Sequence, residues 1–209
     1  MISDRMDHFE KTNKEKGFKY IAGLDEVGRG PLAGPVCSAA VVLPYPIPEE
    51  LLWHVTDSKK LTSSKRDILY ERIYEHALGI GIGVVSEEEV DRINILEATK
   101  CSMIQAVHNI KEIVPDLLLI DGNFKISLDM EQIPIVKGDL KSVSIAAASI
   151  IAKVFRDSLM SDFHFQYPEY NFKKNKGYGT KEHCEMIKKI GPSPIHRKSF
   201  KKVMEYVVL

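Results

Sequence analysis

The chain has 209 residues, a length typical of one domain or of one domain with a small appendage. Hydrophobic residues make up 44% and charged residues 28%, which is ordinary globular composition and excludes a wholly disordered chain. Basic and acidic side chains balance at 29 each, so the net charge of zero argues against a protein that binds nucleic acid or membranes by bulk charge alone.

The sequence also lacks the signals of export or membrane insertion. The apolar runs are too short to span a bilayer, and the first 17 residues have no apolar core of the secretory type. Cys37, Cys101 and Cys184 are widely spaced and form no CxxC pair, which argues against a disulfide framework or a zinc knuckle. We therefore expect a soluble protein of the cytoplasm.

The first half of the chain alternates short apolar runs with turn residues. Residues 1–17 are polar, and we expect a frayed or helical lead-in there. A loop rich in glycine and proline is predicted at residues 25–35, and a proline-rich connection at 44–48. Apolar patterning predicts three strands and one helix in this half, the strands at residues 20–24, 36–43 and 80–85 and the helix at 63–77.

Helices dominate the second half. Ser86 and Glu89 form a capping box, which predicts the start of a helix. The remaining pattern predicts helices at residues 95–113, 142–163 and 180–190, and short strands at 117–120 and 133–136. This order of elements predicts an α/β domain with a mixed sheet.

Charge is unevenly distributed along the chain. Residues 171–209 contain ten Lys and Arg against three Glu, a net charge of +7, so the rest of the chain carries −7. Phe172, Tyr178 and Phe200 interrupt the basic run. Basic residues interleaved with aromatic residues favour a nucleic-acid partner over a merely solvated surface.

Four acidic residues stand where predicted strands end. Asp25 and Glu26 follow the first strand, Asp121 follows the fourth, and Asp139 lies just beyond the fifth. In open α/β sheets, the chemistry gathers beyond the carboxyl ends of the strands. Carboxylates clustered there would suit Mg²⁺ or Mn²⁺. Spacing alone leaves open that each acid only forms a turn or caps a helix.

The position of Asp25 next to Glu26 raises a geometric question. Neighbours in a regular strand point to opposite faces, so both serve one site only if the strand has ended or bulged there. The segment that follows has the spacing GxGxxxG at residues 28–34, which is neither a dinucleotide fingerprint nor a Walker loop. Its glycines let backbone N–H groups approach a ligand, and Arg29 suits a phosphate. A tight turn between two strands explains the segment equally well.

The segment GLDEVGRGPLAGPV at residues 23–36 resembles the signature loop of bacterial ribonuclease HII, of the type 2 ribonuclease H family. Further segments resemble that family in the same order: DSKKL (57–61), IDG (120–122), KGD (137–139), SIIAKVFRD (149–157), KGYGT (176–180) and GPSPIHR (191–197). The resemblance covers residues 18–202, nearly the whole chain. The related ribonuclease HIII is disfavoured, because it usually carries an extra N-terminal domain and a different glycine loop.

The resemblance implies a ribonuclease H-like α/β core, with a mixed five-stranded sheet flanked by helices and a small helical C-terminal part. We expect residues 1–209 to form a single domain, with the catalytic core at residues 18–165 and a basic substrate-binding part at 166–209. The implied activity is that of a metal-dependent endoribonuclease. It would act on the RNA strand of RNA–DNA hybrids and on ribonucleotides embedded in duplex DNA. We expect a monomer with no membrane partner.

The resemblance also implies the site residues. The family's acidic quartet, which would be catalytic and would bind two Mg²⁺ or Mn²⁺ ions, falls on Asp25, Glu26, Asp121 and Asp139. By analogy with the wider fold, Asp25 would bridge the two ions. Asp157 competes with Asp139 for the fourth position, and its alternative role is a structural ion pair beside Arg156.

Substrate-binding residues follow from the same resemblance. Gly28, Arg29 and Gly30 match the family's loop that reads the ribose 2′-OH, and Tyr178 matches the tyrosine at the RNA-to-DNA junction. Lys59 would touch a phosphate, or it is an ordinary surface lysine. For His183 and His196 we expect phosphate contact or a structural role in preference to catalysis.

Two other functions stay open at this stage. A non-catalytic binder of RNA–DNA hybrids would keep the glycine loop and the lysines but would lose one or more carboxylates, and all four are present. A different metal-dependent phosphatase or nuclease on the same core would instead act on plain RNA or DNA duplexes.

Overall fold

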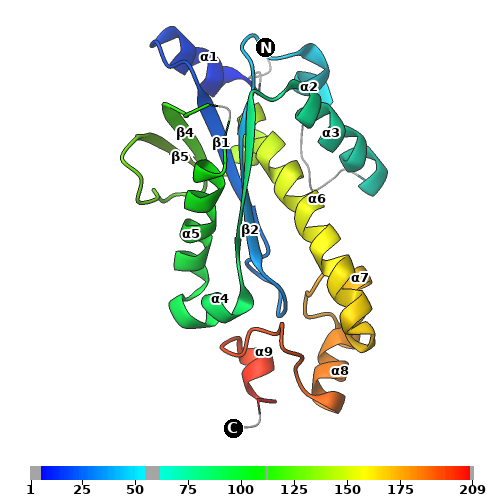
Figure 1. The fold of residues 1–209 in the computed structure, drawn as a ribbon. Helices are drawn as coiled ribbons and strands as arrows, with labels where there is room; N and C mark the ends of the chain where they lie inside the picture. Colours follow the sequence, from blue (N-terminus) through cyan, green and yellow to red (C-terminus); the bar gives the residue numbers. More distant parts are fainter. Residues whose placement is uncertain (1–5, 55–61, 112, 208–209) are drawn as a thin grey trace.

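The fold is a five-stranded mixed sheet with helices on both faces, in a computed structural model that describes residues 6–54, 62–111 and 113–207 (Figure 1). The strands are β1 (Ile21–Val27), β2 (Val36–Val42), β3 (Gly79–Val85), β4 (Leu117–Asp121) and β5 (Glu131–Ile135). They lie in the order β3-β2-β1-β4-β5. The strand β2 is antiparallel to both of its neighbours, β1 and β3, whereas β4 and β5 run parallel to β1. The predicted mixed α/β sheet is confirmed.

Two long helices cover the faces of the sheet (Figure 1). The helix α5 (Ile95–His108), preceded by α4 (Glu87–Ile93), packs on one face, and α6 (Val143–Gln166) crosses the other beside α3 (Ser63–His76). The shorter helices are α1 (His8–Glu15), α2 (Glu49–His54), α7 (Phe172–Asn175), α8 (Lys181–Ile190) and α9 (Lys201–Met204). Two 3-10 helices, η1 (Gly138–Leu140) and η2 (Pro168–Tyr170), flank α6 in the chain.

The strand β2, which lies between β3 and β1, is buried along its whole length because both of its faces are covered. Ala39 and Val41 pack with α3 and α6, whereas Ala40 and Val42 pack with α5. This alternation is the period of two that a strand imposes on its side chains. The continuous apolar run in the sequence therefore reflects a strand buried between two helical layers.

Several predicted boundaries are wrong. The predicted helix at residues 95–113 ends at His108, because Asn109 caps it and donates from its side chain to the carbonyl of Ile82. β5 begins two residues earlier and ends one residue earlier than predicted. The helices α2, α7 and α9 were not predicted, and each is only four to six residues long.

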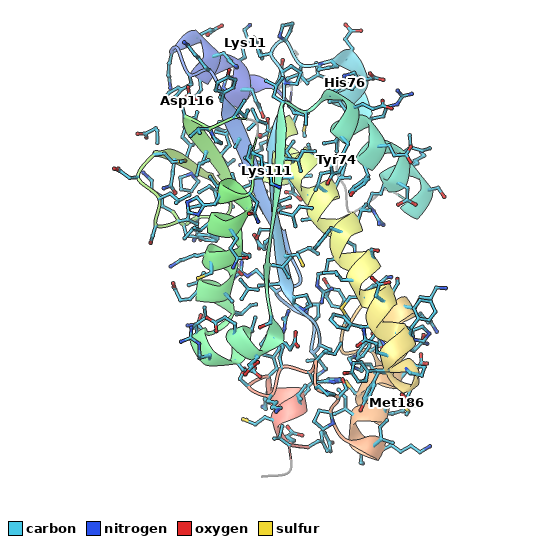
Figure 2. The ribbon with its side chains drawn as sticks, in the orientation of Figure 1. Lys11, Tyr74, His76, Lys111, Asp116 and Met186 are labelled. Atoms are coloured by element: carbon cyan, nitrogen blue, oxygen red, sulfur yellow. The ribbon has the colours of Figure 1, made fainter. Side chains whose placement is uncertain are left out.

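The C-terminal elements pack against the loop between β1 and β2. An apolar cluster joins Leu32 and Ala33 of that loop to residues of the C-terminal segments, among them Tyr170, Ile187 and Val203. Met186, also packed on this cluster, lies on α8 at the far end of the molecule from Lys11 (Figure 2). Within the residues that the structure describes, no helix is long and apolar enough to cross a membrane.

Candidate active site

Asp25 of β1 and Asp121 of β4 stand side by side at one edge of the sheet. The two strands are parallel and in register, and their last paired residues are Leu24 and Ile120, which directly precede the two acids. Equivalent positions on neighbouring strands point to the same face. Asp25 is buried there, with 5% of its surface exposed, and Asp121 is partly buried.

Glu26 joins the same group although the strand neither ends nor bulges at this point. The predicted loop at residues 25–35 was wrong in its first part, since β1 continues to Val27 with regular pairing to β2. The strand β4 ends at Asp121, and its last pair with β1 is Ile120 with Leu24, so no β4 residue pairs with Glu26. One carboxylate oxygen of Glu26, Oε1, lies 3.3 Å from Nη1 of Arg29, and the other, Oε2, is buried without a hydrogen-bond partner.

The residue before Asp139, Gly138, connects the Asp139 segment to Asp121. The backbone N–H of Gly138 donates to Oδ1 of Asp121 at 2.6 Å, which fixes η1 beside the end of β4. Asp139 follows directly in η1 and is 4% exposed. The structure therefore brings the segment that carries Asp139 to the Asp121 carboxylate.

Asp157 lies elsewhere on α6. Its Oδ1 pairs with Nζ of Lys153 at 2.6 Å, so its ion pair is with Lys153 and not with the adjacent Arg156. Ser149, which hydrogen-bonds Asp25, stands eight residues earlier on α6, or about 12 Å along the helix axis. This geometry favours the structural role for Asp157.

The three neighbouring carboxylates repel one another. Burial, followed by the charges of Glu26 and Asp121, raises the pKa of Asp25 well above its ordinary value. Burial also raises the pKa of Glu26, although the Arg29 guanidinium opposes this rise. Clustered carboxylates with raised pKa values are typical of a functional site.

The donor set fits a hard divalent cation. Among the described residues, no group of three or more His, Cys, Asp or Glu side chains is gathered as a ready-made metal site. The chemistry is nonetheless suitable, because Mg²⁺ and Mn²⁺ prefer carboxylate oxygens and the buried Oε2 of Glu26 lacks a partner. A bound cation would also relieve the repulsion that raises the Asp25 pKa.

The glycine loop at residues 28–35 is anchored to the interior of the protein by Arg197. This side chain is fully buried and donates five hydrogen bonds to the backbone carbonyls of Gly28, Arg29, Pro31 and Gly34, at 2.6–3.1 Å. Burial and the charge of Arg156 lower the pKa of Arg197 to about 10, which leaves it protonated at neutral pH. The carbonyls of the loop therefore point toward the buried, positively charged guanidinium of Arg197.

A second buried arginine completes this support. Arg156 of α6 donates to the carbonyls of Ala33, Pro35 and Lys176, which ties the loop to the segment before Tyr178. Gly28 has a φ of +96°, and a Cβ there would collide with the Arg156 side chain. A glycine is thus required at this point by both backbone conformation and space.

Tyr178 lies at the glycine loop. A Cβ added to Gly30 would lie 3.7 Å from the Tyr178 ring, and the backbone N–H of Leu32 donates to the carbonyl of Gly177 at 2.8 Å. The Tyr178 side chain is 44% exposed, as is that of Arg29. The structure therefore brings Gly30 and Tyr178 together, while Lys59 falls outside the described residues.

Sequence reasoning missed the residues that support the site. Arg156 sits on the buried face of α6 with Ser149, Ala152 and Met160, at helical spacings of three and four. That spacing is the signal that places an arginine on a core-facing stripe. The inward role of Arg197 has no such local signal, because its partners lie more than 160 residues away in the chain.

Comparison with known proteins identifies the family of the chain. The family model for ribonuclease HII matches residues 22–203. The ribonuclease HII of Syntrophus aciditrophicus is 56% identical over 198 residues, which cover 94% of this chain and 91% of the relative. The ribonuclease HII of Clostridioides difficile is 55% identical over 194 residues, covering 93% and 74% respectively. The crystal structure of ribonuclease H2 from Pyrococcus horikoshii OT3 superposes with a TM-score of 0.75 at 27% identity, covering 90% of this chain and 97% of that one.

The family match and the fold make this chain a metal-dependent endoribonuclease, an enzyme of the hydrolase class. The chain belongs to the ribonuclease HII family. Its activity is accordingly that of a ribonuclease H, which acts on RNA–DNA hybrids. The choice of ribonuclease HII over ribonuclease HIII is confirmed by the family match.

Proposed function

We propose that this enzyme hydrolyses the RNA strand of RNA–DNA hybrids with two Mg²⁺ or Mn²⁺ ions, and that it also cuts at single ribonucleotides embedded in duplex DNA. The observation that carries the proposal is the placing of Asp25, Glu26 and Asp121 beside a glycine loop that contacts Tyr178. When bound, the two ions supply an activated water and neutralise charge at the scissile phosphate. The residues of the chain hold these ions, orient the substrate and select the sugar.

In this proposal Asp25, Glu26, Asp121 and Asp139 are the metal ligands. Asp25 would take the bridging role, which the action of the Glu26 and Asp121 charges on it supports. Because Ser149 and the Glu26 backbone N–H hydrogen-bond Asp25, its carboxylate is oriented before a ligand arrives. Gly138 orients Asp121 in the same way.

Gly28, Arg29, Gly30 and Tyr178 select the sugars at the cut site. Backbone groups of a glycine loop reach a 2′-OH without an intervening side chain, and only RNA offers that hydroxyl. An exposed tyrosine ring packed on the next sugar accepts deoxyribose but crowds a 2′-OH. The enzyme would therefore prefer ribose on the 5′ side of the cut linkage and deoxyribose on its 3′ side.

The basic segment from residue 166 onward would hold the nucleic-acid backbone, with Lys59 as a further phosphate contact. Its support is the net charge of +7 over residues 171–209 and the packing of this segment against the glycine loop. We further propose that the enzyme acts as a monomer in the cytoplasm.

The test is cleavage of two duplexes, one a uniform RNA–DNA hybrid and the other a DNA duplex with one ribonucleotide, each with Mg²⁺, Mn²⁺ or EDTA. We expect cleavage of both with either metal and none with EDTA. Asp25→Asn should lower turnover by orders of magnitude while binding of the hybrid persists. Near-normal turnover by this variant, or cleavage of plain DNA or RNA duplexes, would refute the proposal.

A second pair of variants separates the two candidates for the fourth ligand. Asp139→Asn should abolish turnover at every metal concentration. Asp157→Asn breaks the ion pair with Lys153, so we expect a milder loss. If Asp157→Asn were the more damaging change, the ligand role would move to Asp157.

A further inference from the structure

Two buried histidines lie directly behind Tyr178. Nδ1 of His183 is 2.9 Å from the carbonyl oxygen of Tyr178, and Nε2 of His183 is 2.9 Å from Nε2 of His196. At the far side, the backbone N–H of Ser193 reaches Nδ1 of His196, also at 2.9 Å. The two imidazoles therefore form a continuous chain of hydrogen bonds from Ser193 to Tyr178.

The chemistry of the two end groups fixes every proton in this chain. The Ser193 N–H can only donate, so Nδ1 of His196 accepts from it, and neutral His196 holds its proton on Nε2; the Ser193 hydroxyl, 2.7 Å from the same Nδ1, then donates as well. A carbonyl can only accept, so Nδ1 of His183 donates to Tyr178, and Nε2 of His183 is bare. The central bond then runs from Nε2–H of His196 to Nε2 of His183.

The surroundings keep both imidazoles neutral. His183 and His196 are at most 1% exposed and pack against the rings of Tyr170 and Phe172. Burial lowers the pKa of both, and for His196 the neighbouring His183 lowers it further. A second proton on His183 would set two N–H donors against each other, and one on His196 would face the Ser193 N–H, so the neutral form of both rings is favoured.

The same pair also links Tyr178 to the glycine loop. His196 forms a bridge with Ala33 of that loop, and the next residue, Arg197, donates its N–H to the carbonyl of Leu32. Displacement of the histidines would therefore shift the Tyr178 backbone relative to Gly30, against which its ring lies. Neither imidazole is exposed, which excludes direct contact with a substrate.

We propose that His183 and His196 are positioning residues, which hold the Tyr178 backbone so that its ring selects deoxyribose beside the cut linkage. The proposal rests on the junction-reading role given to Tyr178 above. In this proposal the histidines influence which substrate is preferred. They neither contact a phosphate nor transfer a proton.

The experiment measures the junction ratio, defined as kcat/KM on a DNA duplex with one ribonucleotide divided by kcat/KM on a uniform RNA–DNA hybrid. His183→Leu should lower this ratio about tenfold with little change on the hybrid, a difference of ~1.4 kcal/mol in transition-state binding. The double variant His183→Leu with His196→Leu also removes the Nε2–H of His196, which the single variant leaves without an acceptor. It should fold and show the same low ratio.

Tyr170→Phe is the matched control. It removes the hydroxyl that donates to the carbonyl of Gly191 but keeps the ring that packs on both histidines. We expect its junction ratio to equal that of the parent enzyme. An equal loss in this variant would show that any damage to the aromatic cluster changes the ratio, which would overturn the specific role of the histidines.

Tyr178→Ala distinguishes failure of this inference from failure of the proposed function. An unchanged ratio in Tyr178→Ala would refute junction reading itself. If Tyr178→Ala lowers the ratio, adding His183→Leu should lower it no further, because the ring to be positioned is gone. A full additional loss in that double variant, equal slowing of both substrates by His183→Leu, or failure of both leucine variants to fold would overturn the positioning role.

Discussion

Replacement of Arg197 by lysine should damage both stability and junction cleavage. The guanidinium donates five hydrogen bonds to four carbonyls of the glycine loop, and it is fully buried. An ammonium keeps the charge but is a single point with no planar fork, so we expect it to reach only two of those carbonyls. Removal of three hydrogen bonds at about 1 kcal/mol each amounts to a loss of about 3 kcal/mol in the free energy of unfolding.

Urea and thermal unfolding followed by circular dichroism measure this loss, and cleavage of a single embedded ribonucleotide measures its effect on the loop. We expect a fall in the melting temperature of about 6–12 °C, from about 2–4 °C per kcal/mol for a chain of this size. Arg92→Lys is the matched control, because Arg92 is an exposed arginine whose Nε pairs with Glu89 at 2.7 Å on the surface of α4. That change should stay within about 0.5 kcal/mol. A loss below about 1 kcal/mol for Arg197→Lys would refute the anchoring argument.

Three further outcomes are expected. Gly83→Ala should destabilise the protein by about 1–3 kcal/mol in urea unfolding, because a Cβ on β3 would overlap the Ser102 carbonyl of α5. Stability should also fall as the pH is lowered. Burial lowers the pKa of His196 from 6.5 to about 3, so as the pH falls this residue is protonated in the unfolded chain before it is protonated in the folded protein. The free energy of unfolding present above pH 6.5 should therefore decline by about 1.4 kcal/mol per pH unit down to pH 3. Gln at both Lys201 and Lys202, which are exposed, should flatten the plot of log K for hybrid binding against log salt by about 0.9 for each phosphate that a lysine no longer neutralises. An unchanged slope would mean that these lysines are merely solvated.

The sequence predicted the acidic edge of the sheet well, because Asp25 and Asp121 follow short apolar strands whose ends meet in a parallel pair. It predicted the local course of β1 less well. Alternation puts neighbours such as Asp25 and Glu26 on opposite faces of a regular strand, yet the charge of Asp121 acts on both, at a point where β4 no longer pairs with β1.

Tertiary contacts decided the features that the sequence could not predict. Ile110 and Ile113 continue the apolar spacing of α5, yet they lie beyond its end and cover Gly79 of β3. Arg197 was counted with the basic surface, since a charged residue is rarely buried without a carboxylate. Its partners are backbone carbonyls, which carry no signature in the sequence.

The hydrogen bonds between Arg197 and the glycine loop also bear on the order in which parts of the enzyme fold during synthesis. Each joins residues 163 to 169 positions apart, so the loop has to wait until Arg197 has been synthesised before its carbonyls find these donors. The strands that carry Asp25 and Asp121 are synthesised long before then, and chains fold from the N-terminal side during translation. A nascent chain can thus bring Asp25 and Asp121 together early, whereas the loop that would select the substrate is completed only after Arg197 has been synthesised.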